Sequence, residues 1–482
     1  MASSGGFYRM GLRQPSVNQG PQGLLPFDFD ATDATDEVTG RAGLPLLLET
    51  MMALHLGQAV KQHLKLRKRN AGFSEAEMVE DLILLLGAGG ECLDDLTILA
   101  ADKGLLRLCD RDKLPSPDAA RSFLLGFHDE NLLSTARSEN PADEASVIYP
   151  ESAALVGLAR VQEHVVAELF RQRPQSVATL EMDATIIESH KKQALPHYKG
   201  GRGYQPSLVY WVEQDVVVAD EFRDGNVPAG KGPLEVVKRA FAALPTSVDH
   251  RRFRADSAAY EDSTLKWLAD PTNRIERFTI SADMTPPLRK LAESVASVEW
   301  KVYESRDNET GFFAEVDFQP GQWPKEAAPM RTLVLKIERR QADMFAEQRG
   351  IKYLGIVSND FTLDGAALIR WHYRKAGCIE VVHDVVKNEL GAGVLPCAAF
   401  GANAAWFRLC LLTYNLLSAM KVLALPPPFE DARPKRLRFA VFNLPARLIS
   451  HARKLLARVA KCLLERADLL LGRARLRATY AT

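Results

Sequence analysis

The stretch SVATLEMD, residues 176–183, decides the fold that we predict for this chain. It reads as an apolar, partly β-branched strand that ends in an acidic residue, Asp183. The stretch RFRAD, residues 252–256, repeats the pattern and ends at Asp256. Two aspartates at the ends of neighbouring strands can converge on one point above a sheet. A site at this sheet edge is therefore the first expectation.

The elements around these two strands indicate a mixed α/β fold. An alternating hairpin is expected on either side of the polar turn 213–215, and amphipathic helices separate the later strands. The order of three strands, helix, strand, helix, strand is typical of a ribonuclease H-like fold. Strands are predicted over residues 176–182, 208–212, 216–222, 252–255 and 276–281, and helices over 232–244 and 258–268.

Changes in pattern along the chain predict four parts. Strand-like segments between about 290 and 345 are expected to form an antiparallel β insertion in the catalytic part. The tail is expected to be helical over 446–464 and 465–476. The parts are a disordered or extended arm (1–40), an all-α domain (41–172), a ribonuclease H-like domain (173–430) and a basic helical tail (431–482).

A third acidic residue is expected on the stretch WHYRKAGCIEVVHDVVKNEL, residues 371–390, which reads as a single helix. At about 100° per residue, Tyr373, Glu380 and Lys387 stay within roughly 40° of one another. A line of polar groups on a helix is also the ordinary pattern of a solvated face. Asp384 is the alternative acid on the same face, whereas Glu389 is about 180° away and is excluded.

Asp183, Asp256 and Glu380 together form a candidate metal site. Three close carboxylates would repel one another unless cations lay between them, and Mg²⁺ prefers such hard oxygen ligands. Two such ions about 4 Å apart support an in-line attack on phosphorus. Metal-dependent phosphoryl transfer is therefore one interpretation. In the other, Asp183 and Asp256 are turn residues that cap the next segment.

With these motifs in view, the chain resembles the DDE transposases of bacterial insertion sequences, in the branch with a Tyr-x2-Arg-x3-Glu-x6-Lys signature. Tyr373, Glu380 and Lys387 match in spacing, and Ala376 stands at the arginine position. Arg374 lies about 160° from that position on a continuous helix. The resemblance runs from about residue 40 to 460, including GAGGECLDDLTILAADKGLL, DATIIESHKKQALPHYKGGRGYQPSLVYW, FRADSAAY and LPCAAFGANAAWFRLCLLTYNLL.

The resemblance implies a cut-and-paste transposase. Such an enzyme binds double-stranded DNA at the terminal inverted repeats of its element and cleaves at the element ends. It then joins the 3′-hydroxyl ends to target DNA. Asp183, Asp256 and Glu380 would hold two Mg²⁺ ions, with Mn²⁺ as a substitute. A homodimer and a bacterial cytoplasmic, nucleoid-associated location are also implied.

Six further residues are candidates for DNA contact. By analogy, Tyr373 and Lys387 would contact phosphates, although core packing and a surface salt bridge explain them equally well. Lys199 and Arg202 lie in the glycine-rich loop YKGGRGY, residues 198–204, which is also a plausible hairpin turn. Trp300 and Trp323 of the β insertion could stack on an unpaired base or pack in the insertion's own core.

Composition gives further expectations about the partner, the compartment and membrane association. The 482 residues carry no net charge, yet residues 431–482 hold 13 Lys/Arg against three Asp/Glu, which favours an anionic partner such as nucleic acid. Six cysteines without CxxC spacing argue against a zinc site and for a reducing compartment. The apolar stretch 404–425 contains Arg408, Asn415 and Lys421, so we expect a buried helix and no membrane association.

Two other assignments stay open from the sequence. The helix after Ser116-Pro117 could be the second helix of a helix-turn-helix or an ordinary bundle helix. For the whole protein, the alternatives are a non-catalytic DNA-binding repressor and a ribonuclease H-like nuclease that cuts without joining strands.

Overall fold

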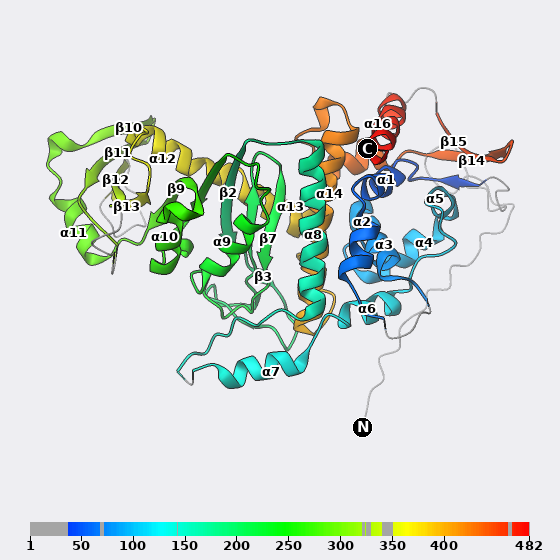
Figure 1. The fold of residues 1–482 in the computed structure, drawn as a ribbon, viewed down its shortest axis with the longest axis horizontal. Coiled ribbons are helices and arrows are strands. Elements are labelled where there is room, and N and C mark those ends of the chain that lie inside the picture. Colours follow the sequence, from blue (N-terminus) through cyan, green and yellow to red (C-terminus); the bar gives the residue numbers. More distant parts are fainter. Residues whose placement is uncertain are drawn as a thin grey trace, which may run out of the picture.

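The computed structural model describes residues 37–67, 72–141, 143–320, 323, 329–339, 350–460 and 465–481. Most of the predicted N-terminal arm, residues 1–36, lies outside this range. The fold is mixed α/β and elongated, with a large sheet toward one end and a group of helices toward the other (Figure 1).

A nine-stranded mixed sheet carries the two predicted acidic strands. Its order is β10-β11-β12-β13-β9-β8-β2-β6-β7. Strand β2 pairs antiparallel with β6 and parallel with β8, which in turn pairs parallel with β9. The predicted order of strands and helices is present: β2 (Val177–Ala184), β6 (Ser207–Trp211), β7 (Val216–Glu221), α9 (Pro233–Ala242), β8 (His250–Ala255), α10 (Asp262–Ala269) and β9 (Ile275–Ala282).

The predicted β insertion is antiparallel, but it extends the central sheet. Its last strand pairs antiparallel with β9, from Gly355 opposite Ala282 to Ser358 opposite Thr279. The ladder therefore runs unbroken from the insertion into the strands that carry the acidic residues. The strands are β10 (Lys301–Arg306), β11 (Glu309–Val316), β12 (Arg331–Arg339) and β13 (Ile351–Ser358).

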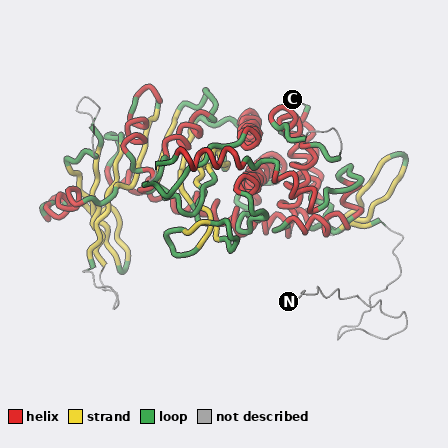
Figure 2. Tube along the Cα trace, turned by 90° about the horizontal axis from the view of Figure 1, so that it is seen from below, coloured by secondary structure: helices red, strands yellow, loops and turns green. Residues whose placement is uncertain are grey.

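The long helix α14 (Phe400–Ala424) lies between the sheet and the N-terminal helices (Figure 1). From below, most strands gather toward one end of the molecule and helices toward the other (Figure 2). Helix α14 packs against β7, α8, α3 and α1, so one apolar core continues across both parts. Helix α6 packs against α14 and α3, as the bundle interpretation expects. The N-terminal helices are α1 (Pro45–Ala53), α2 (Leu56–His63), α3 (Glu75–Ala88), α4 (Leu96–Ala101), α5 (Lys103–Leu108), α6 (Pro117–Leu125), α7 (Glu130–Glu139) and α8 (Ala153–Gln172).

Helix α14 is also the one helix in the described part of the chain that is long and apolar enough to cross a membrane. Its most apolar window has a mean hydropathy of 1.3, and 89% of that window is buried inside the protein. Such burial is the behaviour of a core helix.

The single helix predicted over residues 371–390 is wrong. Helix α12 (Gly365–Tyr373) ends at the tyrosine, a 3-10 turn follows over Arg374–Gly377, and α13 (Ile379–Glu389) then begins. Cys378 at the junction has φ −116° and ψ −83°, outside the helical region. Tyr373 therefore does not share a helix face with Glu380, whereas Glu380 and Lys387 remain on α13.

Buried side chains of the sheet form hydrogen bonds with the backbone groups at this break. The Arg254 guanidinium donates to the Trp371 carbonyl at 2.6 Å. The Glu181 carboxylate accepts the Ile379 N–H at 3.0 Å and thereby fixes the start of α13. These bonds satisfy helix-end groups that would otherwise lack intrahelical partners.

The predicted helix over 446–464 is also wrong. Strands β14 (Ala446–His451) and β15 (Lys454–Val459) form an antiparallel hairpin, and β14 pairs with β1 (Val38–Thr39). Ala452 and Arg453 both have positive φ, at 49° and 64°, as a tight two-residue hairpin turn requires. Pairing with the distant N-terminal strand stabilises the hairpin. The second tail helix is present as α16 (Glu465–Tyr480).

Candidate active site

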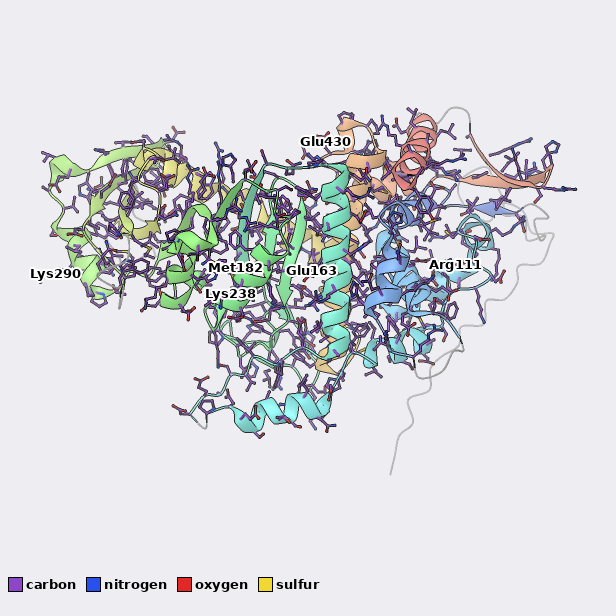
Figure 3. The ribbon with its side chains drawn as sticks, in the orientation of Figure 1. Arg111, Glu163, Met182, Lys238, Lys290 and Glu430 are labelled. Carbon is purple, nitrogen blue, oxygen red and sulfur yellow. The ribbon has the colours of Figure 1, made fainter. Side chains whose placement is uncertain are left out.

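Asp183 and Asp256 lie together at one edge of the central sheet. The register pairs Met182 with Ala255, so the next residues along the two parallel strands are the two aspartates. Met182 marks this position in the middle of the molecule, between Lys290 toward one end and Arg111 among the N-terminal helices (Figure 3). The prediction that the two strand-end acids meet is confirmed.

The surroundings of these acids make the Asp256 carboxylate costly to ionise. Burial raises the pKa of Asp256, and the nearby Asp183 raises it further, while Lys375 lowers it. Each aspartate is also held in place locally. Asp183 accepts the Ala184 N–H at 2.9 Å, and Asp256 accepts the Ala258 N–H at 3.0 Å as the cap of a short 3-10 turn.

His383, on α13, faces the same pair of acids. Its Nε2 lies 3.8 Å from a carboxylate oxygen of Asp183. Burial lowers the pKa of His383 to about 3, with smaller contributions from Lys387 and Lys375, so the ring is neutral near pH 7. This Nε2 is a buried atom without a hydrogen-bond partner in the described structure. An unsatisfied buried nitrogen beside two acids indicates room for a further polar ligand.

Glu380 stands on the first turn of α13, three residues before His383, and is exposed. Helix α13 packs against β2, the strand that ends with Asp183. The i, i+3 spacing places Glu380 on roughly the same helix face as His383. Within the described ranges, no three His, Cys, Asp or Glu side chains are close enough to hold a metal ion, so Glu380 does not join the two aspartates in one such cluster.

The donor set nevertheless fits a hard divalent cation at Asp183 and Asp256. Burial and the neighbouring Asp183 carboxylate raise the pKa of Asp256, and an unsatisfied imidazole nitrogen lies beside Asp183, so a cation between the two carboxylates is favoured. Glu380, on the adjoining helix, is exposed and does not join this pair in one cluster of the described residues.

The alternative acids on α13 have other partners. Asp384 pairs with Arg433 and accepts from Asn388 at 2.6 Å. Glu389 pairs with Arg433 at 2.8 Å and accepts the Lys435 N–H at 2.8 Å. Both carboxylates therefore fix the segment after Pro426–Pro428 against α13, which leaves Glu380 as the available acid.

Two lysines, Lys387 and Lys375, lie near the acids, and a third, Lys199, lies near Lys387. Burial lowers the pKa of Lys387, and Lys199 lowers it further, which places these two ammonium groups near each other. Asp183 acts in the opposite direction on Lys387, so the lysine also lies near the acids. Lys375, in the 3-10 turn, lies near Asp256 and His383. Such a rim of cations is suited to an anionic substrate.

Arg202, the second basic candidate in the glycine-rich loop, has a structural role. Its guanidinium donates to the Ala194 and Lys192 carbonyls at 2.8 and 3.0 Å. The loop is folded as the small sheet β3-β5-β4, with β3 (Ile187–Glu188), β4 (Leu195–Pro196) and β5 (Arg202–Tyr204). A Cβ on Gly203 would lie 2.1 Å from the Ile187 carbonyl oxygen, so this glycine is required by strand packing.

The aromatic candidates have packing contacts of their own. Tyr373 is 40% exposed and packs edge-on against His372. Trp300 packs against Tyr353, with Lys336 over its ring at 5.0 Å. Trp323 is half-buried against the apolar core. The two tryptophans therefore have the packing contacts that were the alternative to base stacking.

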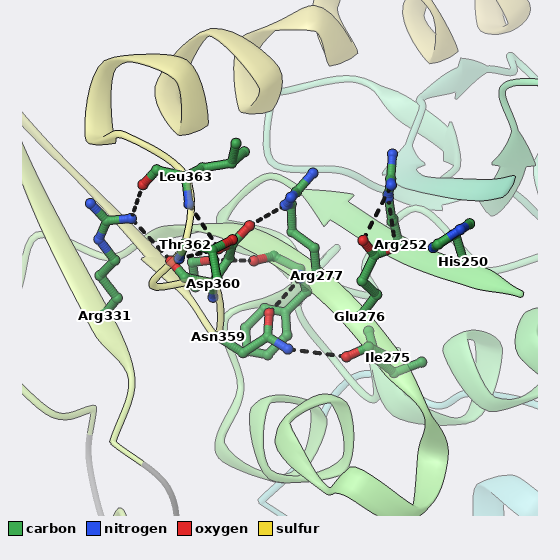
Figure 4. A network of polar contacts seen from close by, with 12 residues as sticks. His250, Arg252, Ile275, Glu276, Arg277, Arg331, Asn359, Asp360, Thr362 and Leu363 are labelled. Atoms are coloured by element: carbon green, nitrogen blue, oxygen red, sulfur yellow. Dashed lines mark hydrogen bonds and ion pairs between the residues drawn. The ribbon is translucent and has the colours of Figure 1, made fainter.

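A polar network holds the loop that leads into α12 (Figure 4). The Asp360 carboxylate pairs with Arg277 of β9 and accepts from the N–H and hydroxyl groups of Thr362. Arg331 of β12 donates to the carbonyls of Asp360 and Leu363 at 3.0 and 2.6 Å. This network joins the sheet extension to β9, the neighbour of the acidic strand β8, and fixes where α12 begins.

Sequence reasoning missed Lys375, His383 and the Glu181–Arg254 pair as parts of this region. The i, i+3 spacing from Glu380 is a signal that could have singled out His383. Lys375 and the Glu181–Arg254 pair carry no comparable local signal, because their contacts depend on the break between α12 and α13.

Comparison with known proteins fits this arrangement. Residues 30–480 match the family described as transposase DDE domain group 1. Among solved structures, the chain is similar to the piggyBac transposase in its synaptic complex with hairpin DNA, at 11% identity and a TM-score of 0.44, covering 80% of this chain and 77% of that one. No curated protein matches the chain. Because the family match spans most of the sequence, the chain belongs to the DDE transposase domain group 1 family.

Proposed function

We propose that this protein is a cut-and-paste transposase of a bacterial insertion sequence. It binds the terminal inverted repeats of its element, cleaves at the element ends and joins the 3′-hydroxyl ends to target DNA. The observation that carries the proposal is the pair Asp183 and Asp256, two like charges on the ends of adjacent parallel strands.

The strand order around these acids supports a ribonuclease H-like core. Strands β7, β6, β2, β8 and β9 are adjacent in that order, with β6 antiparallel and β8 parallel to β2. Asp183 ends the central strand and Asp256 follows its parallel neighbour. This is the sheet that the element order in the sequence predicts.

Asp183, Asp256 and Glu380 are the proposed ligands of two Mg²⁺ ions. Bound magnesium would supply the positive charge that activates a water or 3′-hydroxyl and stabilises the leaving oxygen. Neutral His383 contributes an unsatisfied nitrogen that can orient a water beside Asp183. Lys199, Lys387 and Lys375 neutralise phosphates on either side of the scissile bond. The enzyme acts as a homodimer that bridges two element ends.

The test is metal-dependent cleavage of a duplex that carries the terminal repeat. Wild-type protein with Mg²⁺ or Mn²⁺ is expected to nick at the repeat end and to yield joined products with target DNA. Glu380→Gln should abolish both products and leave end binding intact, because it removes one proposed ligand. Asp384→Asn is the matched control, since Asp384 is tied to Arg433 and should retain cleavage.

Each alternative predicts a different result. Repeat binding without cleavage in either metal would indicate a repressor and contradict the proposal. Cleavage without a joined product would indicate a nuclease. Normal cleavage by Glu380→Gln together with loss in Asp384→Asn would show that the third acid is misassigned.

A further inference from the structure

The β14–β15 hairpin, residues 446–459, is a basic projection that the catalytic site does not use. It lies at the end of the molecule beyond the N-terminal helices, whereas β2 lies in the middle (Figure 1). The segment contains Arg447, Arg453, Lys454 and Arg458 and no Asp or Glu. A concentration of one charge sign on a projecting element indicates a partner of the opposite sign.

The pairing register sorts the side chains of the hairpin onto two faces. Arg447 lies opposite Arg458, Ile449 opposite Leu456, and His451 opposite Lys454. Because side chains alternate along a strand, these six share one face, which we call the basic face. Five of the six are exposed, and Ile449 is partly exposed.

The opposite face holds the hairpin against the body of the protein. Ala446 and Leu448 on that face are buried, and Ser450 accepts a hydrogen bond from Arg107 of α5 at 3.0 Å. The Leu448 N–H donates to the Glu37 carbonyl at 2.8 Å. The hairpin is therefore anchored at its base. Leu456 and Arg458 of the basic face line a hollow with residues of α1, α5 and α16, and the rest of that face is open to solvent.

Two features of the hairpin are unfavourable for folding alone. Arg453 and Lys454 place two positive charges next to each other at its tip, where like charges repel. The turn also places two residues other than glycine, Ala452 and Arg453, at positive φ. A bound polyanion would turn the adjacent charges at the tip into favourable contacts.

We propose that the basic face binds the phosphate backbone of duplex DNA, at a site separate from the acids that act on the scissile bond. A two-stranded ribbon has the width that the major groove of B-DNA admits, and phosphate contacts from Arg and Lys on both strands position it there. Arg453 at the turn extends the contact beyond the strands. This inference rests on the proposed function in that the duplex is the transposase's own substrate.

The test compares two variants that each lose three positive charges. The hairpin variant is Arg453→Gln/Lys454→Gln/Arg458→Gln. The control is Arg160→Gln/Arg171→Gln/Lys238→Gln on α8 and α9, where each cation is already paired with a neighbouring glutamate. Binding of the full-length proteins to an end-bearing duplex and to a random duplex is measured by fluorescence anisotropy over a range of salt, in chelator so that no cleavage occurs.

The hairpin variant is expected to bind both duplexes at least about tenfold more weakly, and the slope of log affinity against log salt should fall by about two to three, since each lost phosphate contact removes about 0.9. The control should bind as the wild type does. The melting temperature of the hairpin variant should stay the same or rise, because the adjacent like charges at the tip are removed. Unchanged affinity and slope would overturn the proposal, as would a shift of oligomeric state without loss of DNA binding.

A second measurement tests the proposal in the case that the hairpin variant folds poorly. A photocrosslinking residue at Leu456, on the basic face, should attach to duplex DNA, whereas one at Val156, exposed on α8, should not. Failure to crosslink at Leu456 contradicts the proposal. The proposed function can fail separately. If the protein crosslinks through the hairpin but never nicks DNA with Mg²⁺, the hairpin site is supported and the transposase activity is contradicted.

Discussion

Two neighbouring positions on the same pair of strands have opposite electrostatics. Glu181 lies opposite Arg254, and the pair is fully buried with a hydrogen bond of 2.7 Å. Two residues further on, Asp183 lies beside Asp256, and the two charges have the same sign. The first pair is neutral overall and holds the backbone of α12 and α13. The second is compensated only in part, by Lys375 near Asp256.

The contrast separates a structural pair from a functional one. A buried ion pair with additional hydrogen bonds can be retained for positioning, even where its net effect on stability is small. A like-charged pair has no such folding role, since it opposes the folded state unless a ligand neutralises it. The sheet therefore positions α13 with one pair of charges, and α13 in turn places His383 beside Asp183 of the other pair.

Removing one charge of the like-charged pair should have the largest effect on activity. Asp256→Asn is expected to reduce cleavage of the end-bearing duplex about a thousandfold or more, since a proposed metal ligand contributes several kcal/mol to the transition state. Folding should not suffer, because the substitution removes repulsion with Asp183. Cleavage assays and thermal melting measure the two effects.

A readout independent of activity sharpens this test. Mn²⁺ should raise the melting temperature of the wild type, because it binds only the folded site, and should raise that of Asp256→Asn much less. Equal shifts in both proteins would mean that the cation binds elsewhere. A large drop in the melting temperature of the variant without metal would assign Asp256 a structural role.

Breaking the compensated pair should instead reduce stability. Glu181→Gln leaves the Arg254 guanidinium buried without a countercharge, which should cost about 3–5 kcal/mol of the free energy of unfolding. Cleavage should fall as well, because the Ile379 N–H loses its carboxylate acceptor and α13 is held less firmly. Denaturant unfolding checks the first effect.

The double variant Glu181→Gln/Arg254→Met is the control for this pair. Removing both charges should restore part of the lost stability, since no unpaired charge remains in the interior. If Glu181→Gln unfolds at the same denaturant concentration as the wild type, the pair does not hold the two helices.

The two pairs also show how far sequence reasoning reaches. Asp183 and Asp256 were predictable because each ends a strand with its own local pattern, and parallel neighbours bring such ends together. The break between α12 and α13 was not predictable, because it depends on a hydrogen bond between residues 198 apart in sequence, from Ile379 to Glu181. Helical periodicity continues through the break and does not reveal it.

The tail is a second case of tertiary contacts overriding local pattern. Residues 446–459 are rich in Leu, Ala, Arg and Lys, which are mostly good helix formers. The strand β14 forms because Val38 and Thr39 provide a pairing edge from the opposite end of the chain. Charge was the more reliable signal here, since the basic character of the tail was visible in the sequence even though its secondary structure was not.

Asp360 is a third carboxylate, and like Glu181 it is paired with an arginine. Removing its charge should have a smaller effect on stability than removing that of Glu181. Asp360 is 5% exposed, and its hydrogen bonds to Thr362 and its pair with Arg277 lower its pKa to about 2, against the opposing effect of burial. Asp360→Asn should cost about 1–2 kcal/mol at neutral pH, because these contacts favour the charged form.

The pH dependence gives the sign of the Asp360 effect. The folded pKa is below the ordinary value of 3.8, so the stabilisation is present above about pH 4 and is lost as the pH falls toward 2. The difference in melting temperature between wild type and Asp360→Asn should therefore shrink over that range. A difference that stays constant down to pH 2 would show that the ionised carboxylate is not the source.

The smallest effect concerns the charge that partly compensates the like-charged pair. Lys375 lies near Asp256 because the 3-10 turn replaces the expected helix, and Ala376 beside it offers no charge. Lys375→Gln should slow cleavage about two- to fivefold and leave the melting temperature unchanged, as expected for a partly exposed charge interaction of up to about 1 kcal/mol.

Arg374→Gln, one residue earlier and exposed, is the matched control. Equal losses in both variants would mean that general positive charge near the turn matters; a loss in Lys375→Gln alone would show that the turn places this lysine to serve the acids.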